Sequence, residues 1–214
     1  GGMLVAFDFD GTLSDSEMTV LLGARQGVAG EMADIPERAM NDELSYAESL
    51  RKRADLLGGL PETTAADAFE EVELRPGAAD VIQALDEAGH TIAILTGGFT
   101  AGVEAALAKE GVAVDHLVAN DLSVADGELS GDVTGPLIEG TKDDALAGLA
   151  DELGVDLADT VAVGDGANDL PMLEVAGLAV GYEPKPAVRP HCDVTVSSMP
   201  DLQSILAENG VLAD

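Results

Sequence analysis

Near its start the chain reads Val5-Ala6-Phe7-Asp8-Phe9-Asp10-Gly11-Thr12-Leu13, an apolar run that predicts a buried strand. The strand ends in two carboxylates and a glycine. Because side chains alternate along a strand, we expect Asp8 and Asp10 to point the same way. Two carboxylates in a buried position repel each other and lose hydration, which favours a cation in the site. Capping of a turn by the aspartates is the alternative that this stretch alone leaves open.

Strand and helix patterns alternate from Pro76 onward, which is typical of a parallel sheet with right-handed crossovers. Residues 15–74 show instead a run of short helical patterns. In it, Pro36 fits the first turn of a helix, and Ser45-Tyr46-Ala47-Glu48 has the form of a capping box. We therefore expect an α/β core of residues 3–14 and 75–214 and a small helical cap of residues 15–74. The cap would exclude water from a site beneath it, although the same helices could also belong to the core.

Two later strand ends carry polar groups. The strand predicted at Thr91 to Leu95 ends in Thr96-Gly97-Gly98, which offers a hydroxyl and bare backbone N–H groups for a phosphate, with simple loop glycines as the alternative. The strand predicted at Thr160 to Val163 runs into Gly164-Asp165-Gly166-Ala167-Asn168-Asp169. The carboxyl ends of parallel strands share one crevice, so we expect these groups to converge with Asp8 and Asp10.

Two further features are a lysine at the start of a predicted helix and a predicted hairpin. Lys142 is the first residue of a predicted helix, where the helix dipole disfavours a cation. Since the chain has few cations, this placement indicates a functional role for the lysine. An ordinary surface lysine is the alternative. The stretch Ser123 to Ser130 alternates around Asp126-Gly127 and predicts a small hairpin projecting from the sheet.

The charge of the chain is extreme, with 41 acidic residues against 10 lysines and arginines and a net charge of −31. This balance argues against nucleic acids and anionic membranes as partners. A folded monomer of this mass exposes roughly 9,300 Å², which spaces the net charges about 17 Å apart. The screening length is ~10 Å at 0.1 M salt and ~3 Å at 1 M, so only concentrated salt suppresses the repulsion. We interpret the chain as a halophile's cytoplasmic protein.

The remaining composition is that of a globular domain. No apolar run reaches the length of a membrane span, and no charged-then-apolar leader opens the chain, so we expect neither insertion nor export. The single Cys192 excludes an internal disulfide and is interpreted as an inert thiol, with a weak metal constellation beside His191 and Asp193 as the alternative. No oligomeric state is predicted.

The converging groups match the requirements of phosphoryl transfer: acids for a divalent cation, a carboxylate nucleophile, a hydroxyl and amides for phosphate oxygens, and one lysine. Their order along the chain also resembles that of the haloacid dehalogenase-like phosphohydrolases, over nearly the whole length. The resemblance implies a Rossmann-like parallel sheet flanked by helices, with the helical cap inserted after the first strand. It also implies a small phosphomonoester as substrate.

The resemblance assigns roles to individual residues. Asp8 would attack phosphorus to form an aspartyl phosphate, and Asp10 would protonate the leaving oxygen and later activate water. Mg²⁺ would be held by the Asp8 carboxylate, the Asp10 backbone carbonyl and Asp165. The phosphoryl oxygens would be bound by Thr96, the Gly97 amide and Lys142. The substrate and Lys142 would be supported by Asn168 and Asp169.

Within this family the chain looks most like the phosphoserine phosphatases, which complete serine biosynthesis. Glu17 and Arg53 lie at the spacing of that group's substrate-binding residues, whereas Thr96 and Tyr46 depart from its usual serine and phenylalanine. Thr96 keeps the hydroxyl, and Tyr46 affects the expected fine specificity. A related small-metabolite phosphatase or phosphotransferase would not require Glu17 and Arg53. A non-enzymatic phospho-acceptor switch is a remoter alternative, because such proteins are shorter and have no cap.

Overall fold

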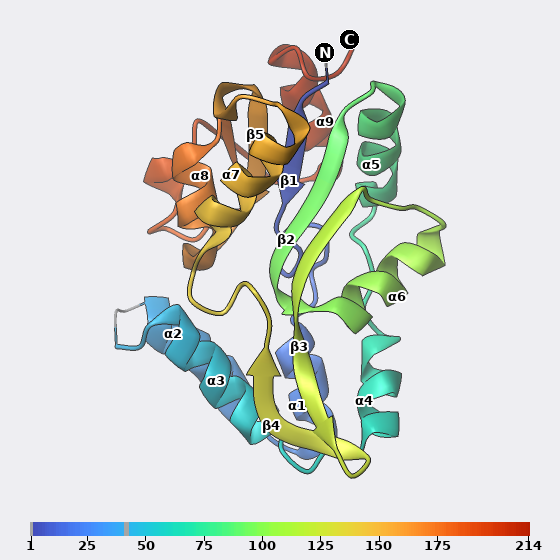
Figure 1. The fold of residues 1–214 in the computed structure, drawn as a ribbon, viewed down its shortest axis with the longest axis vertical. Coiled ribbons are helices and arrows are strands. Elements are labelled where there is room, and N and C mark those ends of the chain that lie inside the picture. The colour runs from blue at the N-terminus through green and yellow to red at the C-terminus, as the bar shows by residue number, and fades with distance from the viewer. Residues whose placement is uncertain (1, 41–42) are drawn as a thin grey trace.

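The computed structural model describes residues 2–40 and 43–214, and its centre is a sheet in the order β4-β3-β2-β1-β5-β6-β7 (Figure 1). Neighbouring strands are parallel except for β4, which is antiparallel to β3. The strands are β1 (Leu4–Phe7), β2 (Thr91–Phe99), β3 (His116–Ala125), β4 (Glu128–Thr134), β5 (Thr160–Gly164), β6 (Leu178–Tyr182) and β7 (Val194–Val196). Starting from the central strand β1, the chain adds β2, β3 and β4 on one side and then β5, β6 and β7 on the other. The order therefore reverses beside β1, where open sheets of this type bind ligands.

Strand β1 is buried on both faces because helices cover both sides of the sheet. Val5 and Phe7 pack into one apolar cluster, whereas Leu4 and Ala6 pack into the other. This alternation explains why the strand sequence is a continuous apolar run. The helices of the two layers are α5 (Ala78–Glu87), α6 (Thr100–Glu110) and α9 (Met199–Glu208) on one face, and α7 (Lys142–Leu153) and α8 (Leu170–Val175) on the other. The predicted α/β fold is confirmed.

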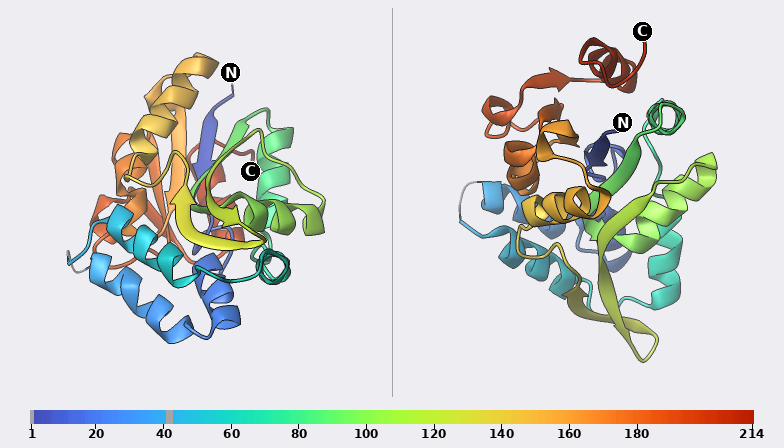
Figure 2. Two further views of the ribbon diagram at one scale, coloured as in Figure 1. Left: turned by 60° about the horizontal axis from the view of Figure 1, so that its bottom comes forward. Right: turned by 45° about the horizontal axis from the view of Figure 1, so that its top comes forward.

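The helical run predicted between β1 and Pro76 is present and lies below the carboxyl ends of the strands (Figures 1 and 2). Its helices are α1 (Met18–Gln26), α2 (Ala29–Met40), α3 (Tyr46–Leu56) and α4 (Glu62–Phe69). The capping box predicted at Ser45 opens α3. The placement of Pro36 in a first turn is wrong, because α2 begins seven residues earlier and contains the proline in its interior. A proline there removes one backbone hydrogen bond without ending this helix.

The β3–β4 hairpin contacts the helical segment between β1 and Pro76, which the sequence did not indicate. Asp126 and Gly127 form its turn with φ of 54° and 77°, the two positive angles of a type I′ turn. On the adjacent strand, the backbone of Leu129 exchanges hydrogen bonds of 2.8 Å with Gly59 and Leu60. The hairpin thus connects the edge of the sheet to the segment between α3 and α4.

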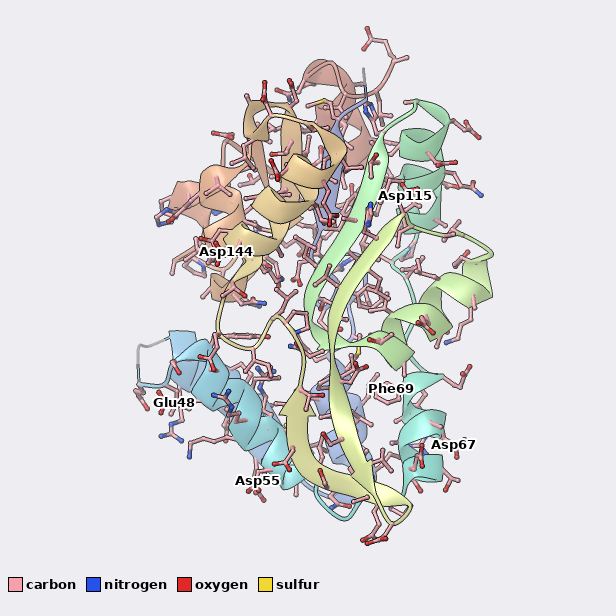
Figure 3. All side chains as sticks on the ribbon, viewed as in Figure 1. Glu48, Asp55, Asp67, Phe69, Asp115 and Asp144 are labelled. Carbon is pink, nitrogen blue, oxygen red and sulfur yellow. The ribbon has the colours of Figure 1, made fainter. Side chains whose placement is uncertain are left out.

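The molecule exposes 9276 Å², close to the value expected from its mass, so the estimated spacing of net charges holds. Acidic side chains such as Glu48 in α3, Asp67 in α4, Asp144 in α7 and Asp115 just before β3 lie on separate parts of the molecule (Figure 3). The negative charge is therefore distributed over the surface. No helix in residues 2–40 and 43–214 has the length and apolarity needed to cross a membrane.

Candidate active site

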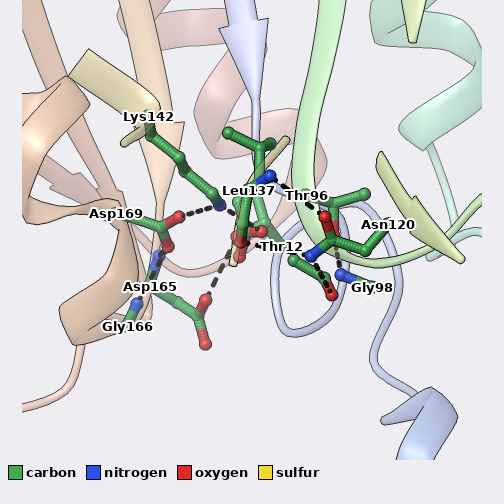
Figure 4. Close-up of polar contacts among 11 residues, drawn as sticks. Thr12, Thr96, Gly98, Asn120, Leu137, Lys142, Asp165, Gly166 and Asp169 are labelled. Carbon is green, nitrogen blue, oxygen red and sulfur yellow. Dashed lines mark hydrogen bonds and ion pairs between the residues drawn. The ribbon is translucent and has the colours of Figure 1, made fainter. Parts of the chain in front are cut away.

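A buried lysine lies between two carboxylates at the carboxyl end of the sheet. Asp8 directly follows β1, Lys142 is the first residue of α7, and Asp169 ends a short 3₁₀ helix, η2 (Ala167–Asp169). The Lys142 Nζ donates to Asp8 Oδ1 at 2.9 Å and to Asp169 Oδ1 at 2.5 Å (Figure 4). Burial lowers the pKa of Lys142, but the two carboxylates outweigh it and leave the pKa above its usual value. The lysine is therefore a fixed cation rather than the surface residue considered as the alternative.

A third carboxylate, Asp165, follows β5 and completes a cluster. One oxygen each of Asp8, Asp165 and Asp169 lies within 4.8 Å of the others. Burial, the largest cause, raises the pKa of each of these three carboxyl groups to about 7. Crowded carboxylate oxygens are the ligands that a hard divalent cation prefers, and such a cation would offset their repulsion. The donor set therefore fits a metal ion, although Asp169 is also occupied by Lys142 and the backbone N–H of Asp165 and Gly166.

Gly11 allows the two acidic strand ends to approach each other. Its φ is +81°, and a Cβ at this position would lie 2.2 Å from Asp165 Oδ2. Thr12 approaches the same carboxylate with its hydroxyl, at 3.5 Å from Asp165 Oδ1. A side chain at residue 11 would thus be strained and would displace Asp165, which explains the glycine after Asp10.

Asp10 is placed to carry a proton. Its Oδ2 accepts a long hydrogen bond of 3.4 Å from the Met18 backbone N–H. Its Oδ1 is buried and has no hydrogen-bond partner within residues 2–40 and 43–214. Burial raises the pKa of Asp10 well above its ordinary value, and the negative charges of Glu17 and Asp8 raise it further. A protonated carboxyl group with a free oxygen in a pocket is suited to donate to a leaving group.

The hydroxyl and glycines predicted to bind phosphate lie at the end of β2, which continues through them to Phe99. The Thr96 Oγ1 accepts a hydrogen bond of 2.9 Å from the Gly98 N–H (Figure 4). This acceptor role leaves the hydroxyl proton of Thr96 free to donate elsewhere.

The sequence reasoning missed Asn120, a fully buried residue of β3. Its Nδ2 donates to the carbonyl oxygens of Gly97 and Leu137, both at 3.1 Å, and its Oδ1 accepts from the Leu137 N–H at 3.0 Å (Figure 4). Asn120 therefore connects the glycine segment of β2 to the loop that leads to Lys142. An asparagine within a strand pattern, where this residue type is depleted, was the available signal.

Arg75 was missed as well. Its Nε donates to the Thr12 carbonyl oxygen at 2.8 Å and its Nη2 to that of Gly11 at 3.1 Å, while its guanidinium stacks over the Tyr182 ring at 4.7 Å. These contacts hold the loop that follows Asp8. The scarcity of cations in the chain was the only signal at this position.

Eight of the ten predicted site residues line one pocket of about 140 Å³. The core contributes Asp8, Asp10, Thr96, Gly97, Asp165 and Asn168, and the segment predicted as the cap contributes Glu17, Tyr46, Ser49 and Arg53. Lys142 and Asp169 lie behind Asp8 and do not line the pocket. Arg53 is only 8% exposed, and its Nε donates to the Ser49 carbonyl oxygen at 3.3 Å. The pocket is therefore lined by carboxylates on the core side, with Lys142 bound behind Asp8. On the side of the helical segment it is lined by the carboxylate of Glu17 and the guanidinium of Arg53.

The known proteins that this chain resembles are hydrolases of one family. The profile of the haloacid dehalogenase-like hydrolases matches residues 5–174. A relative named phosphoserine phosphatase, from Halobacterium salinarum, is 56% identical over 97% of this chain and 99% of its own length. A structure described as a substrate-bound phosphoserine phosphatase complex superposes with a TM-score of 0.90 at 36% identity, over 97% of this chain and 98% of that one. A structure described as a phospho-aspartyl intermediate analogue of phosphoserine phosphatase superposes with a TM-score of 0.89, at the same identity and coverage. The chain belongs to the haloacid dehalogenase-like hydrolase family.

Proposed function

We propose that this protein is a phosphoserine phosphatase that hydrolyses O-phospho-L-serine to L-serine and phosphate through an aspartyl phosphate. The observation that carries this proposal is the pocket itself, in which Asp8 and Asp10 face Glu17 and Arg53. The 56% identity to a protein named phosphoserine phosphatase supports the same substrate. The activity would complete serine biosynthesis, in the cytoplasm of a halophile, in agreement with a relative from the halophile Halobacterium salinarum.

Asp8 is proposed as the nucleophile. Its carboxylate oxygen attacks phosphorus, and the bond between phosphorus and the serine oxygen breaks. Lys142, at 2.9 Å from Asp8 Oδ1, favours the ionised carboxylate that this attack requires. Asp169 holds the lysine in place from the other side.

Asp10 is proposed as the acid and then the base. Its raised pKa keeps it protonated before the attack, so it can give its proton to the departing serine oxygen. Once ionised, it takes a proton from water, which attacks the aspartyl phosphate and releases phosphate with Asp8 restored. Since Oδ1 has no hydrogen-bond partner among the described residues, no neighbouring group competes for this proton there.

The transferred phosphoryl group needs positive and hydrogen-bonding partners, since an anionic nucleophile approaches an anionic ester. We assign these contacts to the Thr96 hydroxyl, the Gly97 amide and Lys142, with Asn168 in support. We further propose that Mg²⁺ binds the Asp8 carboxylate, the Asp10 backbone carbonyl and Asp165. Bound there, Mg²⁺ would neutralise phosphoryl charge during transfer.

Glu17 and Arg53 are proposed to recognise the serine part of the substrate. L-Phosphoserine carries an ammonium and a carboxylate besides its phosphate, and these two side chains offer the opposite charges. A guanidinium can bind a carboxylate through two parallel hydrogen bonds. We retain the division into a core of residues 3–14 and 75–214 and a cap of residues 15–74, in which the cap selects the substrate.

Phosphate release measured over a panel of phosphomonoesters, at high KCl with Mg²⁺, tests the proposal. We expect L-phosphoserine to give the highest kcat/KM of the panel. Equal or higher values for sugar phosphates would favour a related small-metabolite phosphatase, and net transfer of phosphate to an added alcohol would favour a phosphotransferase. A stable phosphorylated protein without turnover would favour the phospho-acceptor switch.

A further inference from the structure

Tyr46 reaches from the cap to the phosphate side of the pocket. It is the first residue of α3, and the capping box in front of it fixes the start of that helix. The Ser45 hydroxyl accepts from the Glu48 N–H at 3.1 Å, and the Glu48 carboxylate accepts from the Ser45 N–H at 3.2 Å. The backbone from which the tyrosine ring extends is therefore held on both sides of Tyr46.

The hydroxyl of Tyr46 occupies the space beside Gly97. A Cβ built on Gly97 would lie 1.7 Å from the Tyr46 oxygen and 2.8 Å from its Cζ. Only a residue without a side chain leaves this space to the tyrosine. The cap thus contacts the core at the amide assigned to the phosphoryl group.

The Tyr46 hydroxyl is available for a ligand. It lines the pocket together with Asp8 and Thr96, and it makes no hydrogen bond to any residue that the structure describes. Burial raises the pKa of Tyr46, against the opposing effect of the Arg53 and Lys142 charges. The phenol therefore keeps its proton near neutral pH and can act as a donor.

We propose that the Tyr46 hydroxyl donates a hydrogen bond to a phosphoryl oxygen of the substrate, so that the cap takes part in binding the phosphate. This inference rests on the proposed function and adds a residue to the phosphate site. The phosphoryl group is favoured over the serine part because the hydroxyl lies against Gly97. A hydrogen bond to an anion in a desolvated pocket is stronger than one between neutral groups.

The substitution Tyr46→Phe removes the hydroxyl and keeps the ring, so the packing against Gly97 is retained. Tyr182→Phe is the matched control, because Tyr182 is the other tyrosine of the chain and stacks under Arg75 instead of lining the pocket. Two quantities are measured at high KCl with Mg²⁺. The first is the affinity for orthophosphate, obtained from the rise in Tm as the orthophosphate concentration increases. The second is kcat/KM for L-phosphoserine and for p-nitrophenyl phosphate.

We expect Tyr46→Phe to weaken orthophosphate binding by about 10- to 100-fold and to lower kcat/KM by similar factors for both substrates. Tyr182→Phe should change neither quantity. An unchanged orthophosphate affinity in Tyr46→Phe would overturn the inference. A loss of kcat/KM confined to L-phosphoserine would also overturn the inference, because the hydroxyl would then bind the serine part of the substrate.

The inference and the proposed function fail in different ways. If the wild-type protein binds orthophosphate more tightly than Tyr46→Phe but prefers another phosphomonoester, the inference stands and the phosphoserine assignment falls. If L-phosphoserine is the preferred substrate and Tyr46→Phe matches the wild type throughout, the assignment stands and the inference falls.

Discussion

The two walls of the pocket are built differently. On the core side, Asp8, Lys142 and Asp169 are buried and joined by hydrogen bonds, and Asn120 ties the glycine segment to the loop before the lysine. On the cap side, Arg53 makes one hydrogen bond within residues 2–40 and 43–214, to a carbonyl oxygen of its own helix. The core groups are preorganised for one reaction, whereas the cap groups keep their hydrogen-bonding capacity for a ligand. The difference is what we expect if, as proposed, the core performs the chemistry and the cap selects the substrate.

The largest effect is expected on the core side, from Asp8→Asn. An amide is not a nucleophile toward phosphorus, so kcat for any phosphomonoester should fall by about 1,000-fold or more. The substitution also removes one charge from a crowded acidic cluster, so the thermal midpoint should not fall by more than about 2 °C. Steady-state phosphate release and thermal unfolding measure the two effects. Near-normal turnover in Asp8→Asn would rule out the covalent mechanism.

A smaller loss is expected from Asp10→Asn, because the role proposed for this residue is proton transfer and not formation of the bond to phosphorus. For L-phosphoserine we expect about 100-fold lower kcat. The loss should be smaller for p-nitrophenyl phosphate, whose leaving group departs without a proton. Parallel assays on the two substrates give the ratio, and identical losses would show that Asp10 does not protonate the leaving group.

Salt should act on the core and the cap together, because acidic residues cover both. Two unit charges 17 Å apart repel by about 0.2 kcal/mol in water, and ~0.1 M salt reduces this about fivefold whereas ~1 M salt removes it. Summed over the net charge of −31, the difference is a few kcal/mol, or a rise in Tm of roughly 5 to 10 °C between ~0.1 and ~1 M KCl. Scanning calorimetry across that range measures it. A Tm independent of KCl would contradict the halophilic interpretation and leave the catalytic one intact.

A pH effect should come from the buried carboxyl groups around the pocket, and the three of the core cluster can be tested together. Burial raises the pKa of Asp8, Asp165 and Asp169 from 3.8 to about 7, so the folded metal-free protein retains protons that the unfolded chain releases. Their contribution to stability is present below about pH 4 and is lost as the pH rises to about 7. Each group loses roughly 2 kcal/mol of stabilisation between about pH 5 and 7, so in a chelator and ~2 M KCl the Tm should fall by about 10 °C or more over that range.

Asp165→Asn is the control for this pH effect, because it removes one of the three groups and should flatten the slope. Added Mg²⁺ should raise Tm most near pH 7, where the carboxylates are ionised. A metal-free Tm that rises from about pH 5 to 7, or a slope unchanged in Asp165→Asn, would show that these carboxyl groups do not have raised pKa values.

The sequence predicted the sheet and the positions of the core groups because their signals are local. An apolar run followed by acids marks the end of β1 and of β5, and parallel strand ends meet at one edge. Lys142 could be identified because a lysine at a helix N-terminus is locally unfavourable. Its two carboxylate partners lie 134 and 27 residues away, so the ion pairs themselves became known only from the structure.

The features that the sequence missed depend on contacts between distant segments. Asn120 and Arg75 act on backbone carbonyls 17 to 64 residues away, and a carbonyl carries no sequence signal. The pairing of Leu129 with Leu60 depends in the same way on the path of the hairpin past the cap. The roles of Glu17 and Arg53 came from the family resemblance, and the structure adds that both line the pocket.

The division between core and cap is tested most directly by Arg53→Ala beside Arg51→Ala. Arg53 is buried in the pocket, whereas Arg51 lies on the same helix in an exposed pair with Glu139. We expect Arg53→Ala to lower kcat/KM for L-phosphoserine by about 30- to 1,000-fold and Glu17→Gln to lower it in the same direction. Neither should affect p-nitrophenyl phosphate by more than about threefold, and Arg51→Ala should be nearly neutral on both substrates. Equal losses on the two substrates in Arg53→Ala would contradict selection of phosphoserine by the cap.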